Sequence, residues 1–263
     1  MRFIFTFGIT YLLVTPTSVA DVIYNANEAF VQSELAGGSP VFGPFSIGHH
    51  DEALPGGFTA FTAGQHTTNF YNPAIHGFYH DNGFDIPAVV VNTNTVSSVT
   101  TSYGATLDPS QILLHPGGLG IQGDELPFHN AILRFTAPTS SEYQIQGDWE
   151  ALAPFKPNHT VNSILINGAS VFSSALNTSS FDLTQTLTAG DFVDFVVNDN
   201  GDIFNDSIGL RATLTASTAA VPEPSTFGLL AIGGIVAGVR IRRRRSAQAA
   251  AASRSSRSKC EAV

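Results

Sequence analysis

The stretch AILRFTAP, residues 131–138, shows most directly how this chain folds. Its apolar side chains at 131, 133 and 135 alternate with the side chains at 132, 134 and 136, and Pro138 ends the run. An apolar period of two is typical of a β-strand that turns one face to a core. The same period recurs at 181–187, 193–197 and 208–214, which predicts a series of such strands.

Turn signals separate these runs, among them Asn167-Gly168 and Ala189-Gly190-Asp191. No amphipathic helix of useful length is predicted. Short strands between turns therefore predict an all-β fold, a two-sheet antiparallel β-sandwich of the jelly-roll kind. Residues 21–110 are richer in Gly, Pro, Asn and aromatic residues. We expect them to supply the first strands of the same sandwich, with a separate small domain as the alternative.

The composition of the 263-residue chain excludes several classes of protein. Hydrophobic residues make up 43%, which is too many for a disordered chain. The one cysteine, Cys260, excludes a disulfide scaffold and a multi-cysteine metal site. Between residues 21 and 220, three Lys and Arg stand against 19 Asp and Glu, a net charge of −16. An acidic body repels nucleic acid, which is therefore not an expected partner.

Residues 1–20 have the features of a secretory signal peptide. Arg2 precedes an apolar run at 3–14, and Ser18-Val19-Ala20 places small residues at both recognition positions. We predict cleavage before Asp21 and export of the chain, with residues 21–220 as a β-sandwich ectodomain.

A second hydrophobic segment lies near the other end of the chain. Residues 221–226, VPEPST, precede an uncharged apolar run at 227–239 and then a cluster of arginines. The stretch from Val221 to Ile241 is about long enough to cross a bilayer as one helix. The arginines should stay on the cytoplasmic side, with the acidic body outside.

Residues 221–245 resemble the PEP-CTERM sorting signal of exopolysaccharide-producing Gram-negative bacteria. All three parts of that signal are present: the motif, the short helix and the basic cluster. The resemblance implies an exosortase-type processing enzyme as a partner. It also implies anchoring in the inner membrane during sorting, followed by a place at the cell surface or in the extracellular matrix. Residues 246–263 depart from the family, whose chains end soon after the arginines, and are predicted to be a disordered basic tail. The residues of the sorting motif are Pro222, Glu223, Pro224, Arg242, Arg243, Arg244 and Arg245.

A run of short motifs in the middle of the chain, among them HPG at 115–117, ILING at 164–168 and AGDFVDF at 189–195, forms a second resemblance. It is similar to the jelly-roll ectodomain of many PEP-CTERM proteins, whose layout is similar to galactose-binding-like and carbohydrate-binding-module sandwiches. Residues 43–48 match the opening motif of that ectodomain, with Phe45 where Trp is usual. The resemblance implies a fold, and suggests sugar binding by association alone.

Four aspartates, Asp194, Asp199, Asp202 and Asp206, crowd one strand–loop–strand stretch. Carboxylates and carbonyls in such a loop suit calcium, which is the one candidate cofactor, and no cofactor is required by the sequence. The alternative is that these aspartates serve as turn residues. The histidines at 49, 50, 76 and 80 are interpreted as solvated loop residues, because no helix is predicted that would place them on one face.

Sugar binding needs exposed aromatic faces with polar neighbours. Trp149, the one tryptophan, and Tyr79 are the predicted ligand-binding residues. Further candidates are Phe45, Tyr71, Phe78 and Phe155.

No sequence motif of a catalytic site is present, so the sandwich is predicted to be non-catalytic and to act by adhesion or packing in a polysaccharide matrix. The alternative is a carbohydrate-active hydrolase of the cell surface. Its carboxylates would be Asp148 and Glu150, which flank Trp149. On a strand these two share one face, and the ring lies on the other.

Overall fold

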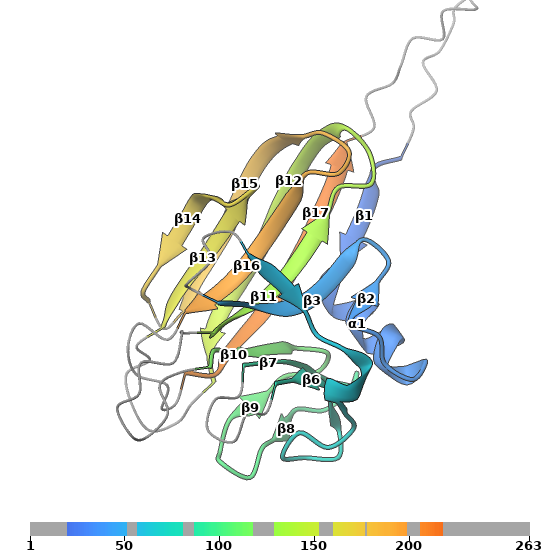
Figure 1. Ribbon diagram of the computed structural model, residues 1–263, viewed down its shortest axis with the longest axis vertical. Helices are drawn as coiled ribbons and strands as arrows, with labels where there is room; N and C mark the ends of the chain where they lie inside the picture. Colours follow the sequence, from blue (N-terminus) through green and yellow to red (C-terminus); the bar gives the residue numbers. More distant parts are fainter. Residues whose placement is uncertain are drawn as a thin grey trace, which may run out of the picture. The chain divides into compact units, whose positions relative to one another are not determined.

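The computed structural model describes residues 20–51, 57–80, 87–117, 129–152, 160–176, 178–198 and 206–217. The predicted signal peptide as far as Val19, the sorting segment and the basic tail lie outside these residues. Ala20–Thr218 form one compact unit. Its described strands pair antiparallel in two main sheets (Figure 1), which confirms the predicted β-sandwich.

The first sheet, called sheet A, runs in the order β15-β12-β17-β10-β7-β6-β5 within the described residues, and β1 also pairs with β17. Both β10 and β1 lie on the same edge of β17, one after the other along its length. The strands are β15 (Thr178–Leu187), β12 (Ser141–Ala151), β17 (Ile208–Ser217), β10 (Ile112–His115), β7 (Ala88–Asn92), β6 (Ile75–Tyr79), β5 (His66–Thr67) and β1 (Val22–Asn25).

The second sheet, called sheet B, runs in the order β14-β13-β16-β11-β3-β2, and β4 also pairs with β3. Strands from residues 21–110 pair with later strands in both sheets, β1 with β17 in sheet A and β3 with β11 in sheet B, so this region belongs to the same sandwich. The strands are β14 (Ala169–Ser174), β13 (Val161–Ile166), β16 (Phe192–Asn198), β11 (His129–Thr136), β3 (Phe45–Asp51), β2 (Val41–Phe42) and β4 (Phe58–Ala60).

The main core lies between the two sheets and consists of the alternate residues that the sequence pattern predicts. On β11, Ala131, Leu133 and Phe135 face this core, and on β17 Leu210 and Leu214 do so. Burial of such side chains is the main force that holds the two sheets together.

A second, smaller core covers part of the outer face of sheet A. Val90 on β7 and Leu113 on β10 point away from the main core and pack with Phe70, Ala105 and Leu107. The hairpin of β8 (Val99–Thr100) and β9 (Thr106–Leu107) supplies part of this cover. The outer face of sheet A therefore has a covered half over β10, β7 and β6, and an open half over β15, β12 and β17.

A short helix follows β1, although none was expected from the sequence. α1 (Ala26–Leu35) begins at Asn25, whose side chain accepts hydrogen bonds from the backbone N–H groups of Asn27 and Glu28. Its helical period is hard to see because polar Asn27 and Glu34 are buried beside Phe30 and Val31. The sequence analysis predicted no amphipathic helix of useful length, and this ten-residue helix has no clear apolar face that could have revealed it.

The side chain of Asn27, in the first turn of the helix, connects the helix to sheet A. Its side chain donates to the carbonyls of Leu210 and Ser110 and accepts from the N–H of Ala212, at 2.8, 3.1 and 3.1 Å. These groups lie at the gap that β1 and β10 leave along the edge of β17. The amide thus takes the place of a missing stretch of strand and satisfies buried backbone groups.

Candidate functional site

Trp149, one of the two predicted sugar-binding residues, lies wholly inside the main core with 0% of its surface exposed. Its ring is 6.0 Å from that of Phe181 and 6.3 Å from that of Phe195, between centroids. It occupies an inward position of β12, opposite to Asp148 and Glu150, because side chains alternate along a strand. A buried ring offers no face to a ligand, so the assignment of Trp149 as a ligand-binding residue was wrong.

Asp194, a predicted calcium ligand, is a buried partner of an arginine. Both its oxygens accept from Arg134, at 2.6 and 2.8 Å, a bidentate geometry. The guanidinium also lies over the rings of Phe58 and Phe192. Burial raises the pKa of the Asp194 carboxyl, and Arg134 opposes that rise. The carboxylate is thus occupied in holding β16 to β11, which corrects its assignment to a metal.

The other predicted calcium ligands do not complete a site in the part of the chain that the structure describes. Asp206 is fully buried, and its backbone hydrogen-bonds to His115. Asp199 and Asp202 lie outside the described residues. Among those that are described, no group of three or more His, Cys, Asp or Glu side chains is arranged to hold a metal ion.

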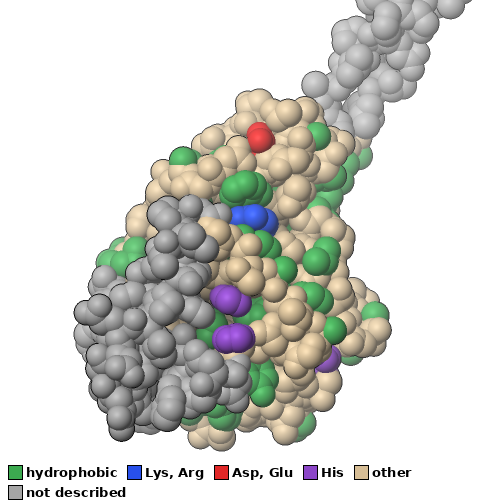
Figure 2. Space-filling view, in the orientation of Figure 1, with side chains coloured by type: hydrophobic (Ala, Val, Ile, Leu, Met, Phe, Trp, Pro, Cys, Tyr) green, Lys and Arg blue, Asp and Glu red, His purple; other side chains and the backbone are tan. Residues whose placement is uncertain are grey.

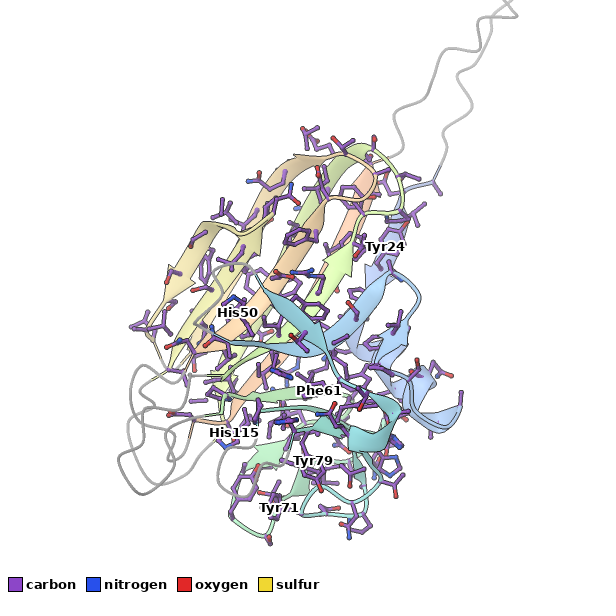
Figure 3. The ribbon with its side chains drawn as sticks, in the orientation of Figure 1. Tyr24, His50, Phe61, Tyr71, Tyr79 and His115 are labelled. Atoms are coloured by element: carbon purple, nitrogen blue, oxygen red, sulfur yellow. The ribbon has the colours of Figure 1, made fainter. Side chains whose placement is uncertain are left out.

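Tyr79, the other predicted ligand-binding residue, begins an aromatic row on the covered half of sheet A. Ring centroids are 5.8 Å apart from Tyr79 to Phe70, 4.9 Å from Phe70 to Tyr71, and 5.2 Å from Tyr71 to Tyr103. Phe70 is buried, whereas 49% of Tyr71 and 40% of Tyr103 is exposed. Figure 3 shows Tyr79 and Tyr71 in the part formed by β6 to β9. The row thus runs from the second core to the surface.

The exposed ring of Tyr71 is held firmly. Its backbone has a φ of 56°, a left-handed conformation that is uncommon for a residue other than glycine. Its carbonyl accepts from the N–H of Ser102, and Asn72 beside it donates to the carbonyl of Thr100 at 2.9 Å. Strained residues of this kind persist only where the surroundings hold them, and they are frequent at binding sites.

Tyr103 supports this ring from the β8–β9 turn and was missed in the sequence. Its hydroxyl end interacts with the side chains of Ser207 and Thr101, and burial of that end raises the pKa of the phenol. The ring itself stays exposed and meets Tyr71 edge to face. The available signal was a Tyr-Gly pair between two short strands, which marks an aromatic residue on a tight turn.

A polar pocket of about 400 Å³ adjoins the other end of the row, at Tyr79. Its rim carries His80, which is hydrogen-bonded to Gln65, and His66, whose Nε2 lies 2.7 Å from Oε2 of Glu34. Burial raises the pKa of the Glu34 carboxyl, and His66 lowers it by a smaller amount. On the face shown in Figure 2, histidine side chains lie near the middle and at the right border, and Lys, Arg, Asp and Glu side chains are sparse. The pocket presents polar side chains beside an aromatic ring.

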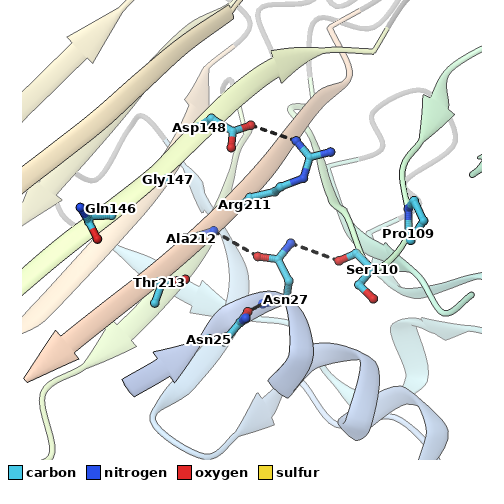
Figure 4. Close-up of a pocket in the computed structure, with 10 residues that line it drawn as sticks. All are labelled: Asn25, Asn27, Pro109, Ser110, Gln146, Gly147, Asp148, Arg211, Ala212 and Thr213. Atoms are coloured by element: carbon cyan, nitrogen blue, oxygen red, sulfur yellow. Dashed lines mark hydrogen bonds and ion pairs between the residues drawn. The ribbon is translucent and has the colours of Figure 1, made fainter. Parts of the chain in front are cut away.

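The open half of sheet A has a different hollow, also of about 400 Å³ (Figure 4). Asp148 and Glu150 share one face of β12, as their spacing predicts. Both lie against the guanidinium of Arg211, at 3.0 and 3.5 Å, and Asp108 pairs with the same group. Glu150 also accepts from Gln111 at 3.0 Å. Both carboxylates of the alternative hydrolase are therefore already engaged with Arg211, and Glu150 is engaged with Gln111 as well.

Fold and sorting motif together define the class: an exported, membrane-sorted protein with an antiparallel β-sandwich. Residues 220–245 match the family described as the PEP-CTERM protein-sorting motif, which confirms the resemblance seen in the sequence. No curated protein matches the chain. In the described part of the chain, no helix is long and apolar enough to cross a membrane.

Several solved structures are similar to parts of the chain, among them the following three. One is CBM51 from Clostridium perfringens GH95 in complex with methyl-galactose, at 13% identity and TM-score 0.32, covering 49% of this chain and 88% of that one. Another is the C-terminal CBM6 of LamC, a laminarinase from Zobellia galactanivorans. Its sequence identity is 10% and its TM-score 0.24, and the match covers 47% of this chain and 89% of that one. The third is the Podospora anserina GH26-CBM35 mannanase. Its sequence identity is 15% and its TM-score 0.26, and the match covers 55% of this chain and 28% of that one. Likeness at this level carries no argument about a ligand.

Proposed function

We propose that the sandwich is a non-catalytic module that binds extracellular polysaccharide through the aromatic row of Tyr79, Phe70, Tyr71 and Tyr103. The observation that carries the proposal is the exposed ring of Tyr71, held in a left-handed backbone conformation between two other rings. A flat apolar face beside polar groups is what a sugar ring requires. The sorting motif would bring this surface to the cell exterior after processing by an exosortase-type enzyme.

The charge of the molecule indicates which class of polysaccharide it should bind. Residues 21–220 carry a net charge of −16, so a polyanionic polysaccharide approaches against a repulsive field. Near the row, the pocket at Tyr79 offers histidine, glutamine and threonine side chains rather than Lys or Arg. We therefore expect neutral glycans to bind better than uronate-rich ones.

Affinity electrophoresis in gels that contain a β-glucan, a galactan, a mannan or a uronate polymer tests this proposal. Tyr71→Ala and Tyr103→Ala should each weaken retention about tenfold, the loss expected when one aromatic contact of about 1.4 kcal/mol disappears. Tyr71→Phe keeps the ring and should bind like the wild type. Val96→Ala is the matched control, because Val96 is 84% exposed and lies outside the row.

Unchanged retention of Tyr71→Ala on a polysaccharide that binds the wild type would remove the row from the binding site. If no polysaccharide retards the wild type, the module does not bind sugar, and a structural role in packing the matrix is the only role left of the two proposed. Reducing-end release is measured on the same polysaccharides, because the alternative hydrolase predicts it. Activity that disappears in Asp148→Asn with Glu150→Gln would favour the enzyme instead.

A further inference from the structure

Strands β14 and β15 are the outermost strands of sheets B and A on one side of the sandwich. They follow each other in the chain and are separated by residues 175–177, so the two open edges lie close together. Figure 1 shows them at the left and upper border of the view. Among the described residues, neither has a further strand beyond it. Each open edge therefore presents a row of backbone N–H and C=O groups.

The edge of β15 lacks most of the features that usually keep sheet edges apart, whereas β14 has a bulge in its pairing with β13. Natural proteins protect long edges with lysine, proline, bulges or charges. β15 extends over 10 residues without lysine, arginine or proline. Asp182 is the one Asp, Glu, Lys or Arg between residues 157 and 190. Its two oxygens accept from Gln144 at 3.2 Å and Gln146 at 3.1 Å on β12, which directs the charge back over the sheet.

Apolar side chains on the same side are only partly covered. Leu176 is 67% exposed and Val171 is 38% exposed. Phe172 and Leu183 pack against the main core but remain partly accessible. A layer that closed over this side would remove apolar surface from water, which is favourable.

The charge distribution indicates that a second copy of the chain is the occupant. Two copies of a body with net charge −16 repel each other, and repulsion is smallest where they meet through an uncharged side. An edge strand can also pair with the same strand of a second copy. A two-fold axis perpendicular to the sheet places the two strands antiparallel, as such a pairing requires. A sugar is less suited to this side, because Phe172 is not presented as a free flat face.

We infer that two copies pair through β15 in antiparallel register about Leu183, which joins two copies of sheet A into one continuous sheet. This register places Leu183 against its own copy and Asp182 opposite Thr184, twice by symmetry. A register about Asp182 instead places the two carboxylates opposite each other, which is destabilising. The pairing is independent of the aromatic row, which lies at the other half of sheet A.

Thr184 tests this pairing because it is exposed on the outer face of β15. The measurement is sedimentation velocity over a wide concentration range on Ala20–Thr218, the compact unit that contains both sheets and both cores. Thr184→Glu places a carboxylate opposite Asp182 of the partner copy and should raise the dimer dissociation constant about tenfold or more. Thr184→Lys places an ammonium there and should lower it.

Thr136→Glu is the control, because Thr136 is an exposed threonine on β11 and the change in net charge is the same as in Thr184→Glu. It should leave the dissociation constant within about twofold. A wild type that is monomeric at every concentration overturns the proposal. Equal weakening by Thr184→Glu and Thr184→Lys overturns the register about Leu183, and equal weakening by Thr136→Glu overturns a specific interface. Circular dichroism of each variant shows whether it is folded.

Discussion

The open and covered halves of the outer face of sheet A belong to one sheet and yet have opposite chemistry. Over β12 and β15, the outward positions hold polar residues such as Gln144, Gln146 and Asp182, which bond to one another. Over β7 and β10, the outward positions hold Val90 and Leu113, buried in a second core. The difference shows that the chain returns to cover one half of the face and leaves the polar side chains of the other half to bond among themselves.

Sequence pattern already separates the two halves. The open half reads as YQIQGDWE at 143–150, an alternation of apolar and polar residues, whereas the covered half reads as AVVV at 88–91 and ILL at 112–114. Continuous apolar runs are typical of strands that are buried on both faces. The aromatic row of the proposed binding site lies at the border between the second core and solvent, where a cover is available to hold exposed rings.

The largest expected effect is the loss of a side chain from the second core. Leu113→Ala removes a wholly buried leucine and should lower the free energy of unfolding by about 3 kcal/mol. Thr215→Ala changes an outward position of β17 in the open half and should cost under about 1 kcal/mol. Urea denaturation of both variants measures the contrast. Similar losses in the two would mean that the cover contributes little.

A smaller effect is expected at His115, which ends β10 beside the second core. Burial lowers the pKa of this imidazole to about 4, while a hydrogen bond with the backbone of Asp206 opposes the shift. The folded state therefore keeps the ring neutral at a pH where the unfolded chain, with a pKa near 6.5, takes up a proton. The free energy of unfolding should therefore fall by about 2 kcal/mol as the pH drops from about 6.5 to 4. This is less than the full pKa shift implies, because His115 keeps some solvent contact.

His115→Gln isolates this contribution. Glu34 and Asp194 have pKa values raised by burial, so their ionisation changes stability with the opposite sign in the acid range. The informative quantity is thus the difference between wild type and His115→Gln in urea midpoints across this pH range. A difference that stays constant with pH would show that His115 titrates alike in the folded and unfolded states.

The strands of the sandwich could be predicted because alternation reports directly on a half-buried strand. The turn at Asn167-Gly168 is confirmed as well, since both residues have positive φ, 49° and 83°, as a tight hairpin turn requires. α1 could not be predicted, because Asn27, which bonds to β17, and Glu34, which bonds to His66, are buried polar residues that blur the helical period. Trp149 was placed wrongly although the same alternation assigned its ring to the face opposite Asp148. Trp149 was chosen as a ligand-binding residue because it is the one tryptophan of the chain. Its position on the strand, however, indicated a core residue.

A local pattern can indicate that β7 and β10 are buried on both faces, but it cannot show which segment covers them or which ring Tyr103 contacts. Which turn folds back over β7 and β10 depends on contacts between residues far apart in the chain, such as Tyr71 with Tyr103. A local period reports on neighbours within one strand and carries no information about such pairs. The binding site proposed here depends on those pairs: Tyr79 was a predicted ligand-binding residue and Tyr71 a further candidate, whereas Tyr103 was missed.

The smallest expected effect concerns the charges of the open half. Arg211 pairs with Asp108, Asp148 and Glu150, but the arginine and Asp148 are each 38% exposed, so water screens the attraction. Exposed pairs of this kind contribute about 0–1 kcal/mol. Arg211→Met removes the cation and leaves three carboxylates near one another. We expect it to lower the free energy of unfolding by about 1 kcal/mol at low ionic strength. In about 1 M NaCl, where the screening length is about 3 Å, most of that loss should disappear. Arg211→Lys keeps the charge and should restore most of the stability at low salt. A loss in Arg211→Met that persists at high salt would show that the stem of Arg211 matters through packing, and that the open half is held together in the same way as the covered half.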